Sequence, residues 1–125
     1  MNTLSKVEII RGYSLIRLFK SAKIIESEYF KYKILVVNKI DVSNLKILIS
    51  VSKRLFKRAV DRNLLKRRIK EVFRLNKGKF VVPNEKLTLI NFIYNCRFIV
   101  DYKGIENDIV TFICNYINNN YGSVA

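Results

Sequence analysis

The alternation of hydrophobic and polar residues along the chain predicts a small sheet packed against helices. Short runs rich in β-branched and aromatic side chains predict three strands, at residues 29–38, 45–51 and 87–95. Apolar residues that recur three and four positions apart predict three helices, at residues 14–21, 59–75 and 105–118. This order of elements predicts an α+β fold, an α/β sandwich with helices on a mixed sheet.

The connections between these elements are less strongly patterned. A short polar segment separates the first two strands, so a hairpin is the simplest pairing for them. The third strand is apolar on both faces for much of its length, which favours a central position under helices. Residues 96–100 either extend this strand or form a separate short one, and residues 101–104 are predicted to be a turn. Half of the 125 residues are hydrophobic, which suits a single domain over residues 1–125.

Positive charge is concentrated in one segment, residues 53–79. This segment holds twelve Lys or Arg residues and two acids, Asp61 and Glu71, for a net charge of +10 in 27 residues. The other 98 residues hold twelve basic residues and eight acids, a net charge of only +4. A concentration of this kind is expected in a protein that binds a polyanion, either a nucleic acid or an anionic membrane surface.

The helix predicted at residues 59–75 separates its apolar residues from its basic ones. At about 100° per residue, one arc of the helix carries Leu65, Ile69, Val72 and Phe73. The adjoining arc carries Arg62, Lys66, Arg67, Lys70 and Arg74. Like charges at this spacing repel one another, and two acids cannot neutralise them. We therefore expect the apolar arc to pack on a sheet and the basic arc to contact nucleic acid.

Residues 49–74, ISVSKRLFKRAVDRNLLKRRIKEVFR, contain three short motifs in a fixed order. The motifs are Val-Ser-Lys-Arg at residues 51–54, Ala-Val-Asp-Arg-Asn at residues 59–63 and Lys-Arg at residues 66–67. In this order and spacing, the 26 residues resemble the protein subunit of bacterial ribonuclease P. The rest of the chain fits that family in length and element order.

Two positions depart from the motifs of that family. The family's basic motif is often Arg-Asn-Arg, and its third position here is Leu64. The loop before Ala-Val usually holds a Gly-Asn pair, where this chain has Lys57 and Arg58. We therefore expect one phosphate contact to be lost at Leu64 and two cations to be gained in the loop.

The resemblance implies a fold and an activity. The fold is a mixed four-stranded sheet with the basic helix in a βαβ crossover, similar to the second domain of ribosomal protein S5. The activity is that of ribonuclease P, a cytoplasmic endoribonuclease that removes the 5′ leader from precursor tRNA. In that enzyme an RNA subunit with bound Mg²⁺ is the catalyst, so the protein is expected to hold no catalytic residue and no metal site. One protein is expected per RNA.

The resemblance also implies two RNA-binding surfaces. The RNA subunit is expected to contact Ser52, Lys53, Arg54, Arg58, Arg62, Asn63, Lys66, Arg67 and Lys70. The leader is expected to lie in a cleft between the first helix and the sheet, against Phe19, Phe30, Tyr32, Lys31 and Lys33. Rings interleaved with lysines suit single-stranded nucleic acid, because bases stack on rings while amines meet phosphates. From the residues alone, a half-buried strand with solvated lysines explains residues 29–38 equally well.

The remaining candidate residues give little support to catalysis by the protein itself. The chain has no histidine, the commonest general base and metal ligand. Two pairs of acids, Glu26 with Glu28 and Glu106 with Asp108, are interpreted as structural or solvated because neither has a third ligand for a two-metal site. The two cysteines, Cys96 and Cys114, fit neither a disulfide scaffold nor a zinc site. They are predicted to be small buried residues of a cytosolic protein.

Three other functions stay open. A structural or ribosomal-type RNA-binding protein would bind RNA without stimulating leader cleavage. A protein-only nuclease would cleave without RNA and would depend on the two pairs of acids. A basic helix on a membrane surface is disfavoured, since a sheet explains its apolar arc more simply than lipid does. No apolar run is long enough to span a bilayer, and no signal peptide is visible.

Overall fold

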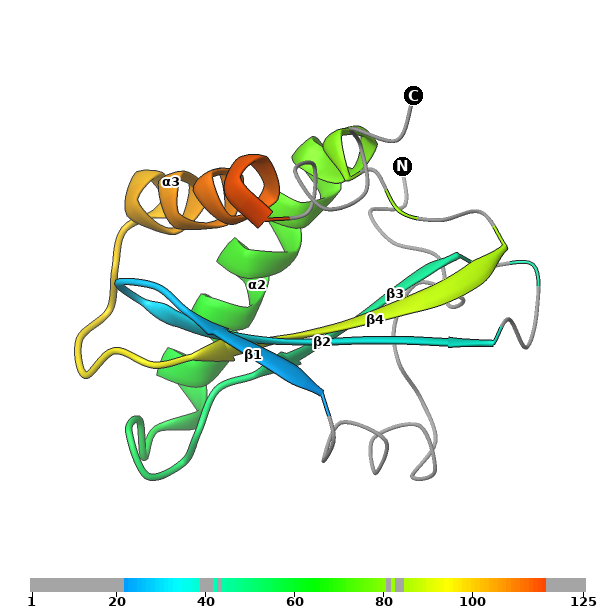
Figure 1. The fold of residues 1–125 in the computed structure, drawn as a ribbon. Coiled ribbons are helices and arrows are strands. Elements are labelled where there is room, and N and C mark those ends of the chain that lie inside the picture. The colour runs from blue at the N-terminus through cyan, green and yellow to red at the C-terminus, as the bar shows by residue number, and fades with distance from the viewer. Residues whose placement is uncertain (1–21, 39–41, 43, 81, 83–84, 117–125) are drawn as a thin grey trace.

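The protein folds as one mixed four-stranded sheet with two helices (Figure 1). The computed structural model describes residues 22–38, 42, 44–80, 82 and 85–116. The strands are β1 (Lys23–Glu26), β2 (Phe30–Asn38), β3 (Leu45–Ser50) and β4 (Lys86–Tyr94). The helices are α2 (Ala59–Asn76), which continues into the short 3₁₀ turn η3 (Lys77–Lys79), and α3 (Tyr102–Phe112).

The strand order across the sheet is β1-β2-β4-β3. β1 is antiparallel to β2, and β2 is antiparallel to β4, with Tyr32 opposite Phe92. β3 is parallel to β4, with Ile49 opposite Phe92. Because parallel neighbours need a crossover, α2 connects β3 to β4 and completes the expected βαβ unit.

Both helices pack on the same face of the sheet. Side chains of α2 and α3 join those of β2, β3 and β4 in a single buried cluster. The ring of Tyr32 on β2 stacks on Phe112 of α3 with centroids 3.9 Å apart, and Phe73 of α2 lies 6.1 Å from Phe92 of β4. On the opposite face, Leu87 and Leu89 of β4 are fully buried. β4 is therefore covered on both faces, which confirms the predicted central strand.

The predicted hairpin between the strands at residues 29–38 and 45–51 is wrong. β4 lies between β2 and β3 and pairs with both of them. The physical reason is burial: β4 is the strand that is apolar on both faces, so the central position removes most apolar surface from water.

The other differences lie at the ends of elements. β1 was not predicted, because KIIE is short and three of its four residues are exposed. α3 begins at Tyr102, not at residue 105, because the Asp101 carboxylate caps it by accepting from the Gly104 N–H at 2.9 Å. Residues 95–101 form an irregular loop. Cys96 is half-buried and Cys114 is exposed, so the predicted burial of Cys114 is wrong.

The helix predicted at residues 14–21, with Phe19, lies outside the described residues. Neither α2 nor α3 combines the length and apolar character that a bilayer-spanning helix needs.

Candidate nucleic-acid interface

The loop between β3 and α2, residues 51–58, is held by hydrogen bonds and by one buried ring. The Phe56 N–H donates to the Ser52 carbonyl at 3.1 Å, and the Arg54 N–H donates to Ser52 Oγ at 2.9 Å. The Phe56 side chain is buried, and its ring lies 5.7 Å from that of Tyr94 on β4. The loop therefore has a defined shape, and it presents four exposed cations: Lys53, Arg54, Lys57 and Arg58.

Arg62, in the first turns of α2, braces this loop. Its Nη1 donates to the Phe56 carbonyl at 2.8 Å and to the Lys57 carbonyl at 2.9 Å. Arg58 lies just before the helix, 4.0 Å from Asp61, and its side chain is still 76% exposed. Arg62 is predicted from the sequence to contact RNA, but the role that its hydrogen bonds show is to position the cations of the loop.

The outer side of α2 continues the positive surface of the loop. Its apolar arc, Leu65, Ile69, Val72 and Phe73, is fully buried, as predicted. Next to that arc, Asn63, Arg67 and Lys70 are exposed and Lys66 is partly exposed. We call the combined loop and helix residues the basic surface; its members are Ser52, Lys53, Arg54, Lys57, Arg58, Asn63, Lys66, Arg67 and Lys70.

Two other arginines of α2 are engaged within the protein. Arg74 pairs with Glu71 through Nε at 3.0 Å and through a second, shorter hydrogen bond from Nη2. These hydrogen bonds from Arg74 hold the pKa of Glu71 below its ordinary value. Arg68 Nη1 donates to the Val100 carbonyl at 2.7 Å and so ties α2 to the loop before α3. The positive surface available to a partner is therefore smaller than the basic arc of the helix suggests.

The aromatic residues predicted to contact the leader are not on the surface. Phe30 and Tyr32 are both 0% exposed, because the sheet face they share is the one covered by the helices. A ring without exposed surface cannot stack on a base, so the predicted contact of Phe30 and Tyr32 with the leader is wrong. Lys31 and Lys33 alternate with them on the opposite face and are half-buried; Lys31 lies 3.9 Å from Glu26.

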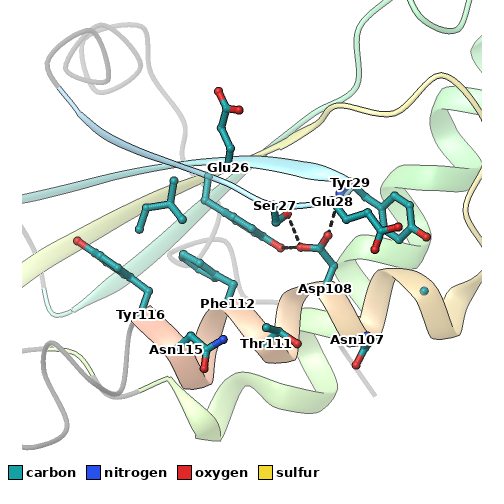
Figure 2. Close-up of a pocket in the computed structure, with 13 residues that line it drawn as sticks. Glu26, Ser27, Glu28, Tyr29, Asn107, Asp108, Thr111, Phe112, Asn115 and Tyr116 are labelled. Atoms are coloured by element: carbon teal, nitrogen blue, oxygen red, sulfur yellow. Dashed lines mark hydrogen bonds between the residues drawn. The ribbon is translucent and has the colours of Figure 1, made fainter.

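Asp108 of α3 ties the turn between β1 and β2 to the helix (Figure 2). Its carboxylate accepts from Ser27 Oγ at 2.6 Å, from the Tyr29 N–H at 2.9 Å and from the Tyr32 hydroxyl at 2.5 Å. Burial, together with the charge and hydrogen bond of Asp108, raises the pKa of Tyr32, which keeps its hydroxyl a donor. The structural interpretation of Asp108 is thus confirmed.

A hollow of about 400 Å³ lies beside this network, between α3 and the β1–β2 turn (Figure 2). Acids from both predicted pairs line it: Glu26, Glu28 and Asp108. Among the residues that the structure describes, no three His, Cys, Asp or Glu side chains are grouped so that they could hold a metal ion. Three donors occupy the Asp108 carboxylate, so this acid has a structural role, whereas Glu26 and Glu28 are exposed.

Known proteins match most of this chain. Residues 13–102 match the sequence model of the family described as Ribonuclease P. The ribonuclease P protein component of Thermotoga maritima is 37% identical over 90 residues, which cover 66% of this chain and 72% of that relative. The chain belongs to the ribonuclease P protein family. It is thus part of the enzyme that processes tRNA 5′ ends, and its family identity implies an RNA subunit as partner.

Solved ribonuclease P proteins share the fold. The protein from Thermotoga maritima superposes with a TM-score of 0.64 at 26% identity, over 81% of this chain and 89% of that chain. A Staphylococcus aureus ribonuclease P protein mutant with defective mRNA degradation activity gives a TM-score of 0.67 at 22% identity, over 92% and 88% of the two chains. The mixed four-stranded α+β fold expected from the sequence is confirmed.

The ribonuclease P motifs recognised in the sequence gather at one place in this fold. The strand-end, loop and helix motifs, at residues 51–54, 59–63 and 66–67, follow one another around the start of α2. Leu64, the departure from the family motif, is half-buried and shares a hollow with Arg67 and Lys70. Sequence reasoning missed the bracing role of Arg62, because hydrogen bonds from a side chain to loop carbonyls leave no pattern in the sequence.

Proposed function

We propose that the basic surface binds the RNA subunit of ribonuclease P. One observation carries the proposal. Six cations of this surface, Lys53, Arg54, Lys57, Lys66, Arg67 and Lys70, make no salt bridge with any acid in the described part of the chain. Unpaired cations gathered on one side of a protein repel one another, and the phosphates of an RNA would relieve that repulsion.

We further propose that the 5′ leader of precursor tRNA lies on the sheet face opposite α2 and α3, against Lys31 and Lys33, and that Phe19, which is outside the described residues, also contacts it. The family membership and the two half-exposed lysines on that face support this placement. Catalysis is assigned to the RNA subunit, which chiefly holds the Mg²⁺. One protein binds one RNA, and the complex works in the cytoplasm.

The test is cleavage of precursor tRNA by a bacterial ribonuclease P RNA at limiting Mg²⁺, with and without this protein. We expect the wild-type protein to stimulate cleavage, because neutralising phosphates lowers the Mg²⁺ that the RNAs need. The double variant Lys66→Glu/Arg67→Glu should bind the RNA subunit on the order of 10-fold or more weakly, and should lose the stimulation.

The matched control is Lys103→Glu, an exposed lysine on α3 outside the basic surface. A reversal of charge there should leave stimulation unchanged. Tight binding of the RNA without any stimulation of cleavage would instead support the alternative function, a structural RNA-binding protein. Cleavage by the protein without RNA would contradict the proposal.

A further inference from the structure

The loop between β4 and α3, residues 95–101, holds a ring on the outside of the molecule. Phe98 is 61% exposed, and Arg97 beside it is also exposed. Every other phenylalanine in the described part of the chain is at most 8% exposed. Phe98 is therefore the exception among the described phenylalanines of this fold.

Four contacts fix the loop. The Tyr94 hydroxyl donates to the Phe98 carbonyl at 2.6 Å and accepts from the Val100 N–H at 2.9 Å. Arg68 of α2 holds the Val100 carbonyl, and the ring of Tyr29 meets Phe98 edge-on with centroids 6.3 Å apart. A ring held in this way loses little conformational freedom when a flat partner stacks on it.

The charge around Phe98 favours a nucleic acid as that partner. Arg97 precedes Phe98 in the chain. Tyr94, whose hydroxyl donates to the Phe98 carbonyl, packs against Phe56 of the loop at residues 51–58, which carries four exposed cations. Figure 1 shows the loops 51–58 and 95–101 at the same end of the sheet, next to the start of α2. Two acids interact with Tyr29, the residue whose ring meets Phe98: Asp101, which caps α3, and Glu28.

We propose that Phe98 is a stacking platform for an unpaired nucleotide of an RNA in the ribonuclease P complex, with Arg97 contacting an adjoining phosphate. Such a pairing of an exposed ring with cations is what single-stranded nucleic acid sites use. This inference rests on the proposed function, and it adds a contact outside the motifs that define the family. The nucleotide belongs either to the RNA subunit or to precursor tRNA.

The chain has no tryptophan, so the variant Phe98→Trp carries a single tryptophan, at the proposed platform, whose emission can be excited selectively over that of the tyrosines. Its emission is followed as a bacterial ribonuclease P RNA is added, and then as precursor tRNA is added to the assembled complex. Quenching in the first step assigns the nucleotide to the RNA subunit, and quenching only in the second assigns it to precursor tRNA. The matched control is Leu75→Trp, at a 55% exposed position near the other end of α2, which should not be quenched.

Affinity gives a second measurement. Phe98→Ala should bind the RNA that quenches the tryptophan on the order of 10-fold more weakly, since stacking of one base contributes about that factor. Phe98→Tyr should restore the affinity, and Leu75→Ala should leave it unchanged.

Two results would overturn the inference, and they are distinguishable. Emission from Phe98→Trp that responds to neither RNA, while wild-type binding stays tight and salt-sensitive, would remove the platform and leave the proposed function standing. Failure of the wild-type protein to bind either RNA would remove both.

Discussion

Arg62 and Arg67 lie five residues apart on α2 and carry the same charge, but their surroundings differ. Arg62 donates to two carbonyls of the loop at residues 51–58, and Arg67 is exposed on the basic surface. A sequence motif gives both the same role in RNA binding. The structure separates a residue that builds the surface from one that belongs to it.

This difference can be measured with one pair of variants. Arg62→Gln should lower the free energy of unfolding by about 1.5–3 kcal/mol, the range for hydrogen bonds from a charged group. It should also speed exchange of the Phe56 amide hydrogen, which bonds to Ser52. Arg67→Gln should weaken RNA binding with a stability change under about 0.5 kcal/mol. Urea unfolding and hydrogen exchange test both, and equal stability of the two variants would contradict the bracing role.

Tyr94 provides a test through pH. Burial raises the pKa of the Tyr94 hydroxyl to about 12, whereas in the unfolded chain this hydroxyl has a pKa of about 10. Between these values the folded state holds a proton that the unfolded state has released. The contribution of Tyr94 to stability is therefore complete below about pH 10 and is lost as the pH rises toward 12.

We expect the free energy of unfolding to fall less steeply in Tyr94→Phe than in the wild-type protein over that range. The difference in slope should not exceed about 1.4 kcal/mol per pH unit, the value for one proton. Urea unfolding at several values of pH gives both slopes. Parallel curves would show that the Tyr94 hydroxyl titrates alike in both states.

Phe30 and Tyr32 show what alternation can and cannot predict. The pattern in residues 29–38 correctly placed the two rings on one face of a strand and the lysines on the other. Which face the helices cover depends on the crossover of α2 and the docking of α3, and neither is encoded within the strand itself. The resemblance to a family did not show which face of the strand the helices cover either.

The helix α2 has a buried apolar side and an exposed basic side, and its sequence predicted both. Leu65, Ile69, Val72 and Phe73 build the core under it, whereas Lys66, Arg67 and Lys70 face outward. A period of 3.6 residues is strong over 18 residues, so the helix and its buried arc were predictable. Strand pairing was not, because the pattern of a strand describes its faces and not its neighbours, and the hairpin prediction failed for that reason.

The two sides of α2 should respond differently to substitution. Phe73→Ala should lower the free energy of unfolding by about 3–5 kcal/mol, because the ring is fully buried against Phe80 and Phe92. Leu75→Ala, two residues on and largely exposed, should change it by less than about 0.5 kcal/mol. Thermal or urea unfolding compares the two, and similar losses would mean that α2 packs on the sheet in another orientation.

Across the whole molecule, the net charge of +14 is divided unevenly, and this asymmetry should appear in the salt dependence of RNA binding. If the six unpaired cations of the basic surface each reach a phosphate, affinity should fall roughly 10³-fold between about 50 and 200 mM salt. Each neutralising substitution on this surface, such as Lys70→Gln, should lower the slope of log affinity against log salt by about 1.

Filter binding or fluorescence anisotropy at several salt concentrations measures these slopes. Lys103→Gln serves as the control, since its side chain is exposed on α3 outside the basic surface. An affinity that does not change with salt would contradict phosphate contact as the source of binding.

The position of β4 between β2 and β3 has a consequence for how the protein is made. The ribosome produces β1, β2, β3 and α2 before it produces β4, the strand that both β2 and β3 require as a neighbour. Until residue 94 has emerged, β3 lacks the strand that it pairs with, and the sheet under the apolar arc of α2 is incomplete. Folding of this small protein is therefore delayed until most of it has been translated, and such late closure exposes nascent chains to aggregation.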